Sequence, residues 1–225
     1  MTDARQNQEI WDEIYSSGRM LWYPYEVAVR IIHGIKADGA LDGIILDHGC
    51  GSGNHLEFMT RLGLDVAGTE ISPSSIALIK ARFAGAKLPA PPLTLFDPTR
   101  PLAPQLPEYN HVFAWGSVHY NRKEKFLADL HDLIRGLPQG GRFVLAVPSL
   151  NDVIAKHSVR EADGTYRVVE DVSGQKGAVL TIPLDRNELV GWCEGIAVED
   201  CGHFGWVLHG VHSEFLFIHG ERKGA

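Results

Sequence analysis

One short stretch constrains the fold of this chain more than any other, because three apolar residues there lead into an acid and a glycine-rich turn. Residues 44–46 are Ile-Ile-Leu, Asp47 follows them, and glycines then occupy every second position from 49 to 53. The apolar run predicts a short buried strand, and the apolar spacing over residues 56–62 predicts a helix after the glycines. Glycine adopts backbone angles closed to other residues and lets a ligand approach the main chain. We therefore predict a ligand-binding turn between a strand and the free N–H groups of a helix.

A second strand ends in an acid that fits the same ligand. Residues 64–69 are expected to form this strand, and Glu70 follows it, 19 positions after Gly51. An acid at this place can accept hydrogen bonds from both hydroxyls of a ribose. The two strands together indicate a nucleoside ligand.

The glycine spacing shows which kind of nucleoside is favoured. A dinucleotide fingerprint needs glycine or alanine at the sixth position of Gly-x-Gly-x-x-Gly/Ala. Counted from Gly49 that position is Asn54, and counted from Gly51 it is Leu56. A nicotinamide-dependent oxidoreductase is therefore the less favoured alternative.

The pattern that does fit is acid-x-Gly-x-Gly-x-Gly, from Asp47 to Gly53, which resembles the first motif of the class I S-adenosylmethionine-dependent methyltransferases. In that family the turn wraps the methionine part of the cofactor. The resemblance implies that Glu70 binds the ribose, that Ile71 covers the adenine, and that Asp97 holds the adenine amino group. The residues expected to bind S-adenosylmethionine are Trp22, Asp47, Gly49, Cys50, Gly51, Gly53, Glu70, Ile71, Phe96, Asp97 and Trp115.

The resemblance extends along most of the chain and implies its fold. Residues 137–143, Leu-Pro-Gln-Gly-Gly-Arg-Phe, closely resemble the family's turn into its fifth strand. We expect a Rossmann-like, doubly wound α/β fold with a mostly parallel seven-stranded sheet, an antiparallel last strand and helices on both faces. The chain is long enough for one such domain, residues 1–225. Further strands are expected at 93–96, 109–115, 142–148, 197–204 and 211–219, and further helices at about 72–83, 123–137 and 185–193.

The N-terminal residues 1–37 are predicted to form a helical cap. One helix is expected to start after Thr2 or Asp3 and to end near Gly18, and a second to carry Pro24 in its first turn. The aromatic segment between them includes Trp22. In similar small-molecule methyltransferases such a segment folds over the cofactor, and aromatic faces attract a sulfonium cation. The alternative is that these aromatic residues pack the helices onto the sheet.

Residues 158–183 depart from the alternation of strands and helices. Asp163-Gly164 and Ser173-Gly174 are turn signals, and the apolar runs at 166–169 and 178–182 predict an inserted β-hairpin. We expect this hairpin to lie over the active site. Together with the aromatic segment it would roof a pocket for a small-molecule acceptor.

The loop after the fourth strand, residues 116–120, is expected to face the chemistry, because ligands bind at the carboxyl ends of parallel strands. His119 is the predicted general base and Tyr120 the second choice. The alternative for His119 is a loop histidine with a structural hydrogen bond. Methyl transfer needs mainly alignment and exclusion of water, so a base is optional.

The composition of the chain limits its possible partners, its cellular compartment and its metal content. A formal net charge of −7 argues against nucleic acid, and no apolar stretch is long enough to cross a bilayer. The first residues lack the apolar core of a signal peptide, and the three cysteines have neither disulfide nor metal spacing, which favours the cytoplasm. The eleven histidines do not have the spacing of a zinc site, so no metal is expected.

One further alternative keeps the cofactor motif without the activity. A partner subunit or sensor that binds S-adenosylmethionine and transfers nothing would carry the same glycines and the same acids. The pattern leaves open the acceptor, the attacked oxygen, nitrogen or sulfur atom, and the oligomeric state.

Overall fold

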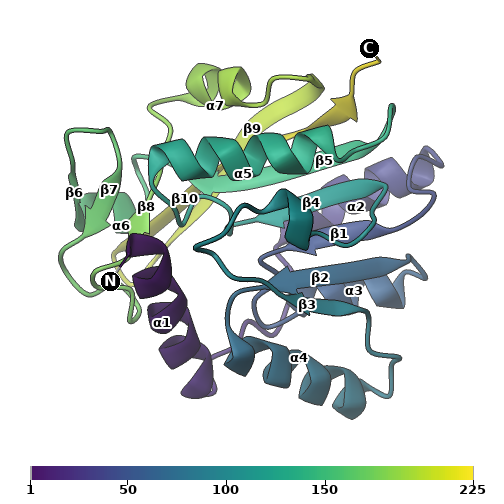
Figure 1. Ribbon diagram of the computed structural model, residues 1–225, viewed down its shortest axis with the longest axis horizontal. Coiled ribbons are helices and arrows are strands. Elements are labelled where there is room, and N and C mark those ends of the chain that lie inside the picture. The colour runs from purple at the N-terminus through teal and green to yellow at the C-terminus, as the bar shows by residue number, and fades with distance from the viewer. Residues whose placement is uncertain (1, 225) are drawn as a thin grey trace.

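The computed structural model describes residues 2–224 and is built on a seven-stranded sheet with the order β3-β2-β1-β4-β5-β10-β9 (Figure 1). The first five strands in this order pair in parallel, and β10 is antiparallel to both of its neighbours. This is the predicted sheet, with its antiparallel last strand. The strands are β1 (Ile45–His48), β2 (Val66–Glu70), β3 (Leu93–Leu95), β4 (His111–Trp115), β5 (Arg142–Pro148), β9 (Ile196–Leu208) and β10 (Val211–Arg222).

Helices cover both faces of the sheet, because neighbouring strand residues point to opposite sides. Leu46 belongs to a core formed with α5 (Lys123–Arg135) and α7 (Arg186–Trp192), which lie in front of the sheet in Figure 1. Its neighbour Ile45 belongs to a core on the other face. The helices of that face are α2 (Glu26–Ala37), α3 (Asn54–Arg61) and α4 (Pro73–Ala86). The predicted doubly wound fold is confirmed.

The strand order reverses between β1 and β4, which creates the crevice where such folds bind ligands. The glycine turn follows β1, and the loop of residues 116–120 follows β4. The two loops touch, since a Cβ atom added to Gly49 would overlap Ser117. The fold therefore brings the predicted cofactor turn and the predicted catalytic loop together.

The N-terminal helix α1 (Asp3–Ser16) begins after Thr2, whose hydroxyl accepts a hydrogen bond from the N–H of Arg5. The second helix starts later than predicted. Tyr25 is its N-cap in an extended conformation, so Pro24 precedes the helix instead of occupying its first turn. In this extended conformation the Tyr25 ring packs against Trp115 and Trp206.

The insert at 158–183 is larger than a hairpin. After the short helix α6 (Val153–Lys156), strands β6 (Ser158–Arg160), β7 (Tyr166–Val168) and β8 (Val179–Leu180) form a separate antiparallel sheet in that order. The β7–β8 pair is the predicted hairpin. The strand β6 escaped prediction because its three residues alternate too briefly to give a pattern. The small sheet has its own core and packs on α1.

The last two strands are longer than expected and meet in a tight turn at His209 and Gly210, both with positive φ. Positive φ at both central positions is typical of the two-residue turns that match strand twist. Trp206, expected in a loop, therefore lies in β9. Along residues 2–224, no helix combines the length and the apolar character that a bilayer crossing requires.

Candidate functional site

The glycine turn adopts a backbone that other residues would not fit. Gly49, Gly51 and Gly53 have φ angles of 67°, 53° and 77°. The N–H groups of Gly49 and Cys50 both donate to the Thr69 carbonyl, at 2.8 and 3.1 Å, which ties the turn to β2. A Cβ atom at Gly51 would lie 2.6 Å from the Tyr15 hydroxyl. Hydrogen bonds to β2 therefore fix the turn, and the Tyr15 side chain of α1 lies against it.

Two buried acids stand beside this turn. The Glu70 carboxylate accepts hydrogen bonds from the N–H groups of Gly51, Ile71 and Ser72, at 2.8, 2.6 and 3.1 Å. Burial raises the pKa of Glu70, although these hydrogen bonds lower it. Burial, and then the charge of Glu70, also raise the pKa of Asp47 well above its usual range. Asp47 Oδ2 has no hydrogen-bond partner within residues 2–224, so this carboxylate is available to a ligand donor.

Two cavities meet at the turn. The inner cavity, of about 70 Å³, is bounded by Glu70 and Phe96 on the sheet side and by Trp11 and Tyr15 on α1. Its remaining lining includes Ala4, Asn7, His48, Gly49, Ile71, Pro98, Gly116, Ser117, Val118, Tyr120, Asn121 and Asp129. This volume is small beside a nucleoside, so we expect the Trp11 and Tyr15 side chains to move when one binds.

The outer cavity, of about 410 Å³, is larger and opens beside the first. Both cavities are lined by Trp11, Tyr15, Gly49, Gly116 and Tyr120. The outer cavity is also lined by Asp47, Cys50, Gly51 and Trp115. Its far wall comes from segments distant in the sequence, including Met20, Leu21, Tyr25, Asp152, Gln175, Trp206 and Phe215.

Most of the residues predicted to bind the cofactor line these cavities, but Gly53, Trp22 and Asp97 line neither of them. Trp22 is 69% exposed, and its ring packs under Arg82 at 5.8 Å. The Asp97 carboxylate accepts from the N–H and hydroxyl of Thr99, at 3.0 and 2.7 Å, and pairs with Arg5 at 3.5 Å. Hydrogen bonds from Thr99 lower the pKa of Asp97. Among the described residues that line either cavity, neither Trp22 nor Asp97 occurs.

Tyr120, the second choice from sequence, lines the cavities, and the predicted base His119 does not. His119 is 1% exposed, burial lowers its pKa to about 3, and neither ring nitrogen has a partner within residues 2–224. The ring lies behind Tyr120, with centroids 4.3 Å apart. Tyr120 lines both cavities, and its hydroxyl donates to Gln175 Oε1 at 2.6 Å. The His119 ring lines neither cavity, and its lowered pKa makes it a weak proton acceptor, which argues against a general base.

Known structures share this architecture. A protein from echinomycin biosynthesis, described for the conversion of a disulfide bond into a thioacetal group, is 19% identical, with 96% of this chain and 93% of its own aligned and a TM-score of 0.68. An S-adenosylmethionine-dependent methyltransferase from Anabaena variabilis is 12% identical, with 99% and 96% aligned and a TM-score of 0.69. The 1,6-didemethyltoxoflavin-N1-methyltransferase of Burkholderia thailandensis is 15% identical, with 96% of this chain and 87% of its own aligned and a TM-score of 0.64. At these identities the similarity shows the fold.

A family model matches part of the sequence. Residues 45–141, from β1 to the turn before β5, match the family model described as a methyltransferase domain. The chain carries a methyltransferase domain over residues 45–141, and its fold is that of the class I S-adenosylmethionine-dependent methyltransferases. The predicted family, enzyme class and cofactor are confirmed. No curated protein sequence matches the chain at a significant level.

Several residues of the methyltransferase site escaped prediction. Trp11 and Tyr15 lie one helical turn apart on α1, so the pair was visible as a helix face pointing at one target. Asp152 follows β5 at the carboxyl edge of the sheet, where ligands are expected. Tyr25, Gln175 and Trp206 gave no local signal. Metal binding finds no support in the part of the chain described, where no group of three potential ligands occurs.

Replacing Glu70 tests its assignment to the cofactor. We expect Glu70→Gln to weaken binding of S-adenosylhomocysteine by about 1.5–3 kcal/mol, the range for a hydrogen bond to a charged group. Asp97→Asn is the matched control, because this acid lies outside both cavities, and it should change the affinity by less than about 0.5 kcal/mol. Titration calorimetry measures both. Equal losses in the two variants would restore Asp97 to the cofactor site, and no loss in Glu70→Gln would remove Glu70 from it.

Helix α1 is held over the site by a buried amide. Asn7 Nδ2 donates to the carbonyls of Tyr120 and Val179, at 2.7 and 2.8 Å, and its Oδ1 accepts from the N–H of Val179 at 2.9 Å. One side chain thus ties α1 to the loop after β4 and to the small sheet. Figure 1 shows α1 running from that sheet towards α4.

Removing this amide should loosen the cap. Asn7→Ala leaves the Val179 N–H and two carbonyls without partners, which costs about 2–4 kcal/mol of unfolding free energy. Gln8→Ala removes a part-buried hydrogen bond to the Ile71 carbonyl and one from the Arg5 guanidinium, and it should cost about 1 kcal/mol. Urea unfolding gives both values, and limited proteolysis should cut α1 faster in Asn7→Ala. Similar stabilities for the two variants would contradict the role of Asn7.

Proposed function

We propose that this methyltransferase methylates a small molecule that binds in the outer cavity. The supporting observation is that four separate segments enclose this cavity. They are α1, residues 19–25, the α6 and small-sheet insert, and the ends of β9 and β10. A folded macromolecule could not bring an atom past these segments to the glycine turn. This enclosure supports an acceptor small enough to enter alone.

The residues around the two cavities and the glycine turn fit S-adenosylmethionine by their chemistry. Buried Asp47 offers an acceptor oxygen without a partner to an ammonium group, and Glu70 offers its carboxylate to ribose hydroxyls. Ile71 and Phe96 offer apolar contact to a planar base, and Gly49, Gly51 and Gly53 leave the main chain open. Cys50 and Trp115 line the outer cavity, beside the turn. When bound, the cofactor supplies an electrophilic methyl group.

The protein's own contribution is alignment and exclusion of water. Trp11 and Tyr15 cover the inner cavity, and Tyr120 stands where the two cavities meet. Burial raises the pKa of Tyr120, so its phenol stays protonated near neutral pH. It can hold an acceptor by a hydrogen bond and does not serve as a base. His119 supports the Tyr120 ring from behind.

The solved relatives include proteins that act on small molecules. The Burkholderia thailandensis protein was crystallised with 1,6-didemethyltoxoflavin and S-adenosylhomocysteine. A magnesium protoporphyrin IX methyltransferase from Synechocystis, 16% identical with a TM-score of 0.60, has bound S-adenosylmethionine. These examples favour a small acceptor for this chain.

Transfer of a labelled methyl group tests the proposal. The enzyme is incubated with S-adenosylmethionine carrying a labelled methyl group and with a cell extract that has been divided by ultrafiltration. We expect the label in the low-mass fraction. Label in protein or nucleic acid alone would contradict a small acceptor, and no transfer to any fraction would favour the silent cofactor-binding alternative.

Tyr120 is expected to act on turnover and not on cofactor binding. With the labelled low-mass fraction as acceptor, Tyr120→Phe should lower the rate about tenfold, because one hydrogen bond of about 1 kcal/mol or more is lost at the acceptor. Its affinity for S-adenosylhomocysteine should stay within twofold. A matched change of the neighbouring ring, His119→Gln, tests the prediction from sequence. A larger loss of rate in His119→Gln, in a folded variant, would return the catalytic role to His119.

A further inference from the structure

The outer cavity has an aromatic wall that is already assembled. Tyr25 stacks with Trp206 at a centroid distance of 5.7 Å and an interplanar angle of 30°. The Tyr25 ring is also 6.0 Å from Trp115 and 6.3 Å from Phe215. All four rings line the cavity. Offset and tilted ring pairs at these distances attract one another, so the wall is preformed for a flat ligand.

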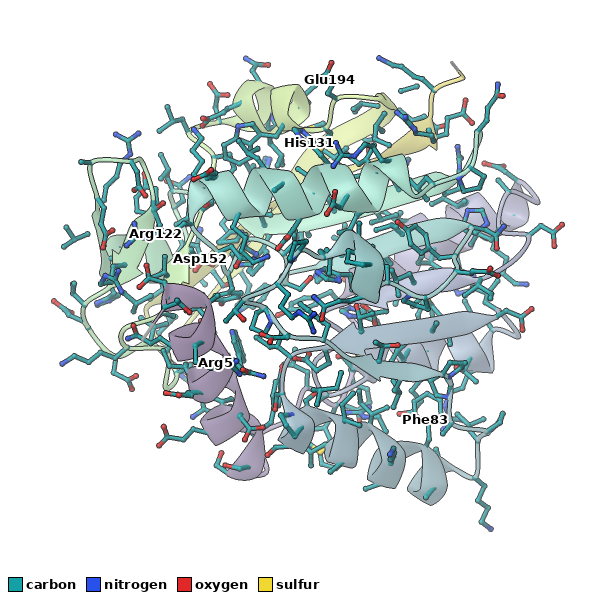
Figure 2. All side chains as sticks on the ribbon, viewed as in Figure 1. Arg5, Phe83, Arg122, His131, Asp152 and Glu194 are labelled. Carbon is teal, nitrogen blue, oxygen red and sulfur yellow. The ribbon has the colours of Figure 1, made fainter. Side chains whose placement is uncertain are left out.

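One acid is set into the same cavity. Asp152, in the loop after β5, is buried and lies where the small sheet meets α1 (Figure 2). Its Oδ1 accepts from the N–H of Ile154 at 2.8 Å. Its Oδ2 accepts from the Ser213 hydroxyl at 3.0 Å and from the N–H of Glu214 at 2.9 Å. A carboxylate has room for about four hydrogen bonds, so Oδ1 keeps a free acceptor position.

The charges around this cavity favour a cationic ligand. Among its described lining residues the acids are Asp47, at the cofactor turn, and Asp152. The basic residues are Arg19 and His55, and burial lowers the pKa of His55 to about 3, so it is uncharged. Arg19 is exposed, and its guanidinium donates to the Ser173 carbonyl at the rim. Burial raises the pKa of Asp152, so a positive charge beside it would restore its ionised form. An anionic ligand would have to lie against this buried acid.

We propose, resting on the proposed function, that the acceptor is a planar amine: its ring lies against Tyr25 and Trp206 while a protonated nitrogen contacts Asp152. The nitrogen is an anchor, and no proton or bond is exchanged there. Rings of tyrosine and tryptophan attract cations on their faces, which adds to the carboxylate. The same features disfavour planar acids of equal size.

Three probes with one ring system and different charges test this. The protein, saturated with S-adenosylhomocysteine, is titrated at pH 7 with 2-naphthylmethylamine, 2-naphthalenemethanol and 2-naphthoate. We expect the amine to bind at least about tenfold tighter than the alcohol, the size of one charge-assisted hydrogen bond, and the carboxylate to bind most weakly. A carboxylate that binds as tightly as the amine would overturn the proposal.

Variants test whether Asp152 causes the preference for the amine. Asp152→Asn should bring the affinity for the amine down about tenfold, to that for the alcohol, while the alcohol changes by less than twofold. Asp200→Asn makes the same change of charge on an exposed part of β9 and should leave all three affinities unchanged. An amine preference that survives Asp152→Asn would overturn the assignment to this residue.

A second variant, Trp206→Ala, keeps the proposal testable if Asp152→Asn does not fold. If Asp152→Asn does not fold, the ranking of the probes on the wild-type protein and a loss of affinity for all three probes in Trp206→Ala, largest for the amine, support the proposal, and unchanged affinities in Trp206→Ala overturn it. The first step of the titration also separates the two claims. Binding of S-adenosylhomocysteine without an amine preference overturns only the planar amine, whereas no binding of S-adenosylhomocysteine overturns the proposed function.

Discussion

Gly49→Ala is expected to remove most of the cofactor affinity. The added methyl group would overlap Ser117, on the loop after β4, in a backbone with φ of 67°. The left-handed conformation costs about 1–2 kcal/mol and overpacking a further 1–3 kcal/mol. We expect the unfolding free energy to fall by about 2–5 kcal/mol and the folded variant to bind S-adenosylhomocysteine at least about tenfold more weakly.

Gly63→Ala is the control for the backbone effect alone. Gly63 has a similar φ of 74°, and an added Cβ would meet nothing within 4 Å. This variant should lose about 1–2 kcal/mol of unfolding free energy and keep its cofactor affinity. Calorimetry and urea unfolding of the two variants give the comparison. Equal cofactor affinity in Gly49→Ala and the wild-type protein would show that the turn can move without consequence.

Acid should unfold this protein early, because histidines are buried in uncharged form and three of them have strongly lowered pKa values. Burial lowers the pKa of His48 to about 4 and those of His55 and His119 to about 3. In the unfolded chain each titrates near 6.5. Between the two values the unfolded state binds more protons, so the stabilising contribution is present above about pH 6.5 and is lost as the pH falls. Each histidine contributes a slope of up to about 1.4 kcal/mol per pH unit.

Asp47 and Glu70 act in the opposite direction. Burial raises the pKa of each, so the folded state holds protons that the unfolded state has released, which offsets part of the loss on acidification. The net slope between about pH 6 and 4.5 is expected to lie between about 1.4 and 4 kcal/mol per pH unit. Urea unfolding at several pH values measures it. His119→Gln should flatten the slope, and His33→Gln, which changes an exposed histidine on α2, should not. An unfolding free energy of the wild-type protein that does not change over this pH range would contradict the burial of these histidines in uncharged form.

The parts of the site that could be predicted are those written in consecutive residues. The turn from Gly49 to Gly53 and the acid Glu70 follow short buried strands, and the order of a parallel sheet fixes the edge at which they meet. The helix α1 and the pair β7–β8 were likewise visible as local patterns. Local periodicity is enough for these because one face of each element is buried.

The parts that could not be predicted depend on contacts between distant segments. His119 was expected to face the acceptor, but the N–H of Thr181 donates to its carbonyl at 2.8 Å and Asn7 binds the Tyr120 carbonyl. These contacts turn the loop so that Tyr120 faces the cavities and His119 is buried. The role of Asp152 depends on Ser213 and Glu214, about sixty residues away in the chain. Such pairs leave no trace in the spacing of either segment.

A crystal structure with S-adenosylhomocysteine tests the central assignment most directly. The account predicts the ribose hydroxyls within hydrogen-bond distance of Glu70, the amino group at Asp47, and the rings of Trp11 and Tyr15 moved away from the inner cavity to admit the nucleoside. A ligand bound elsewhere, with Glu70 still bonded only to the N–H groups of residues 51, 71 and 72, would contradict it.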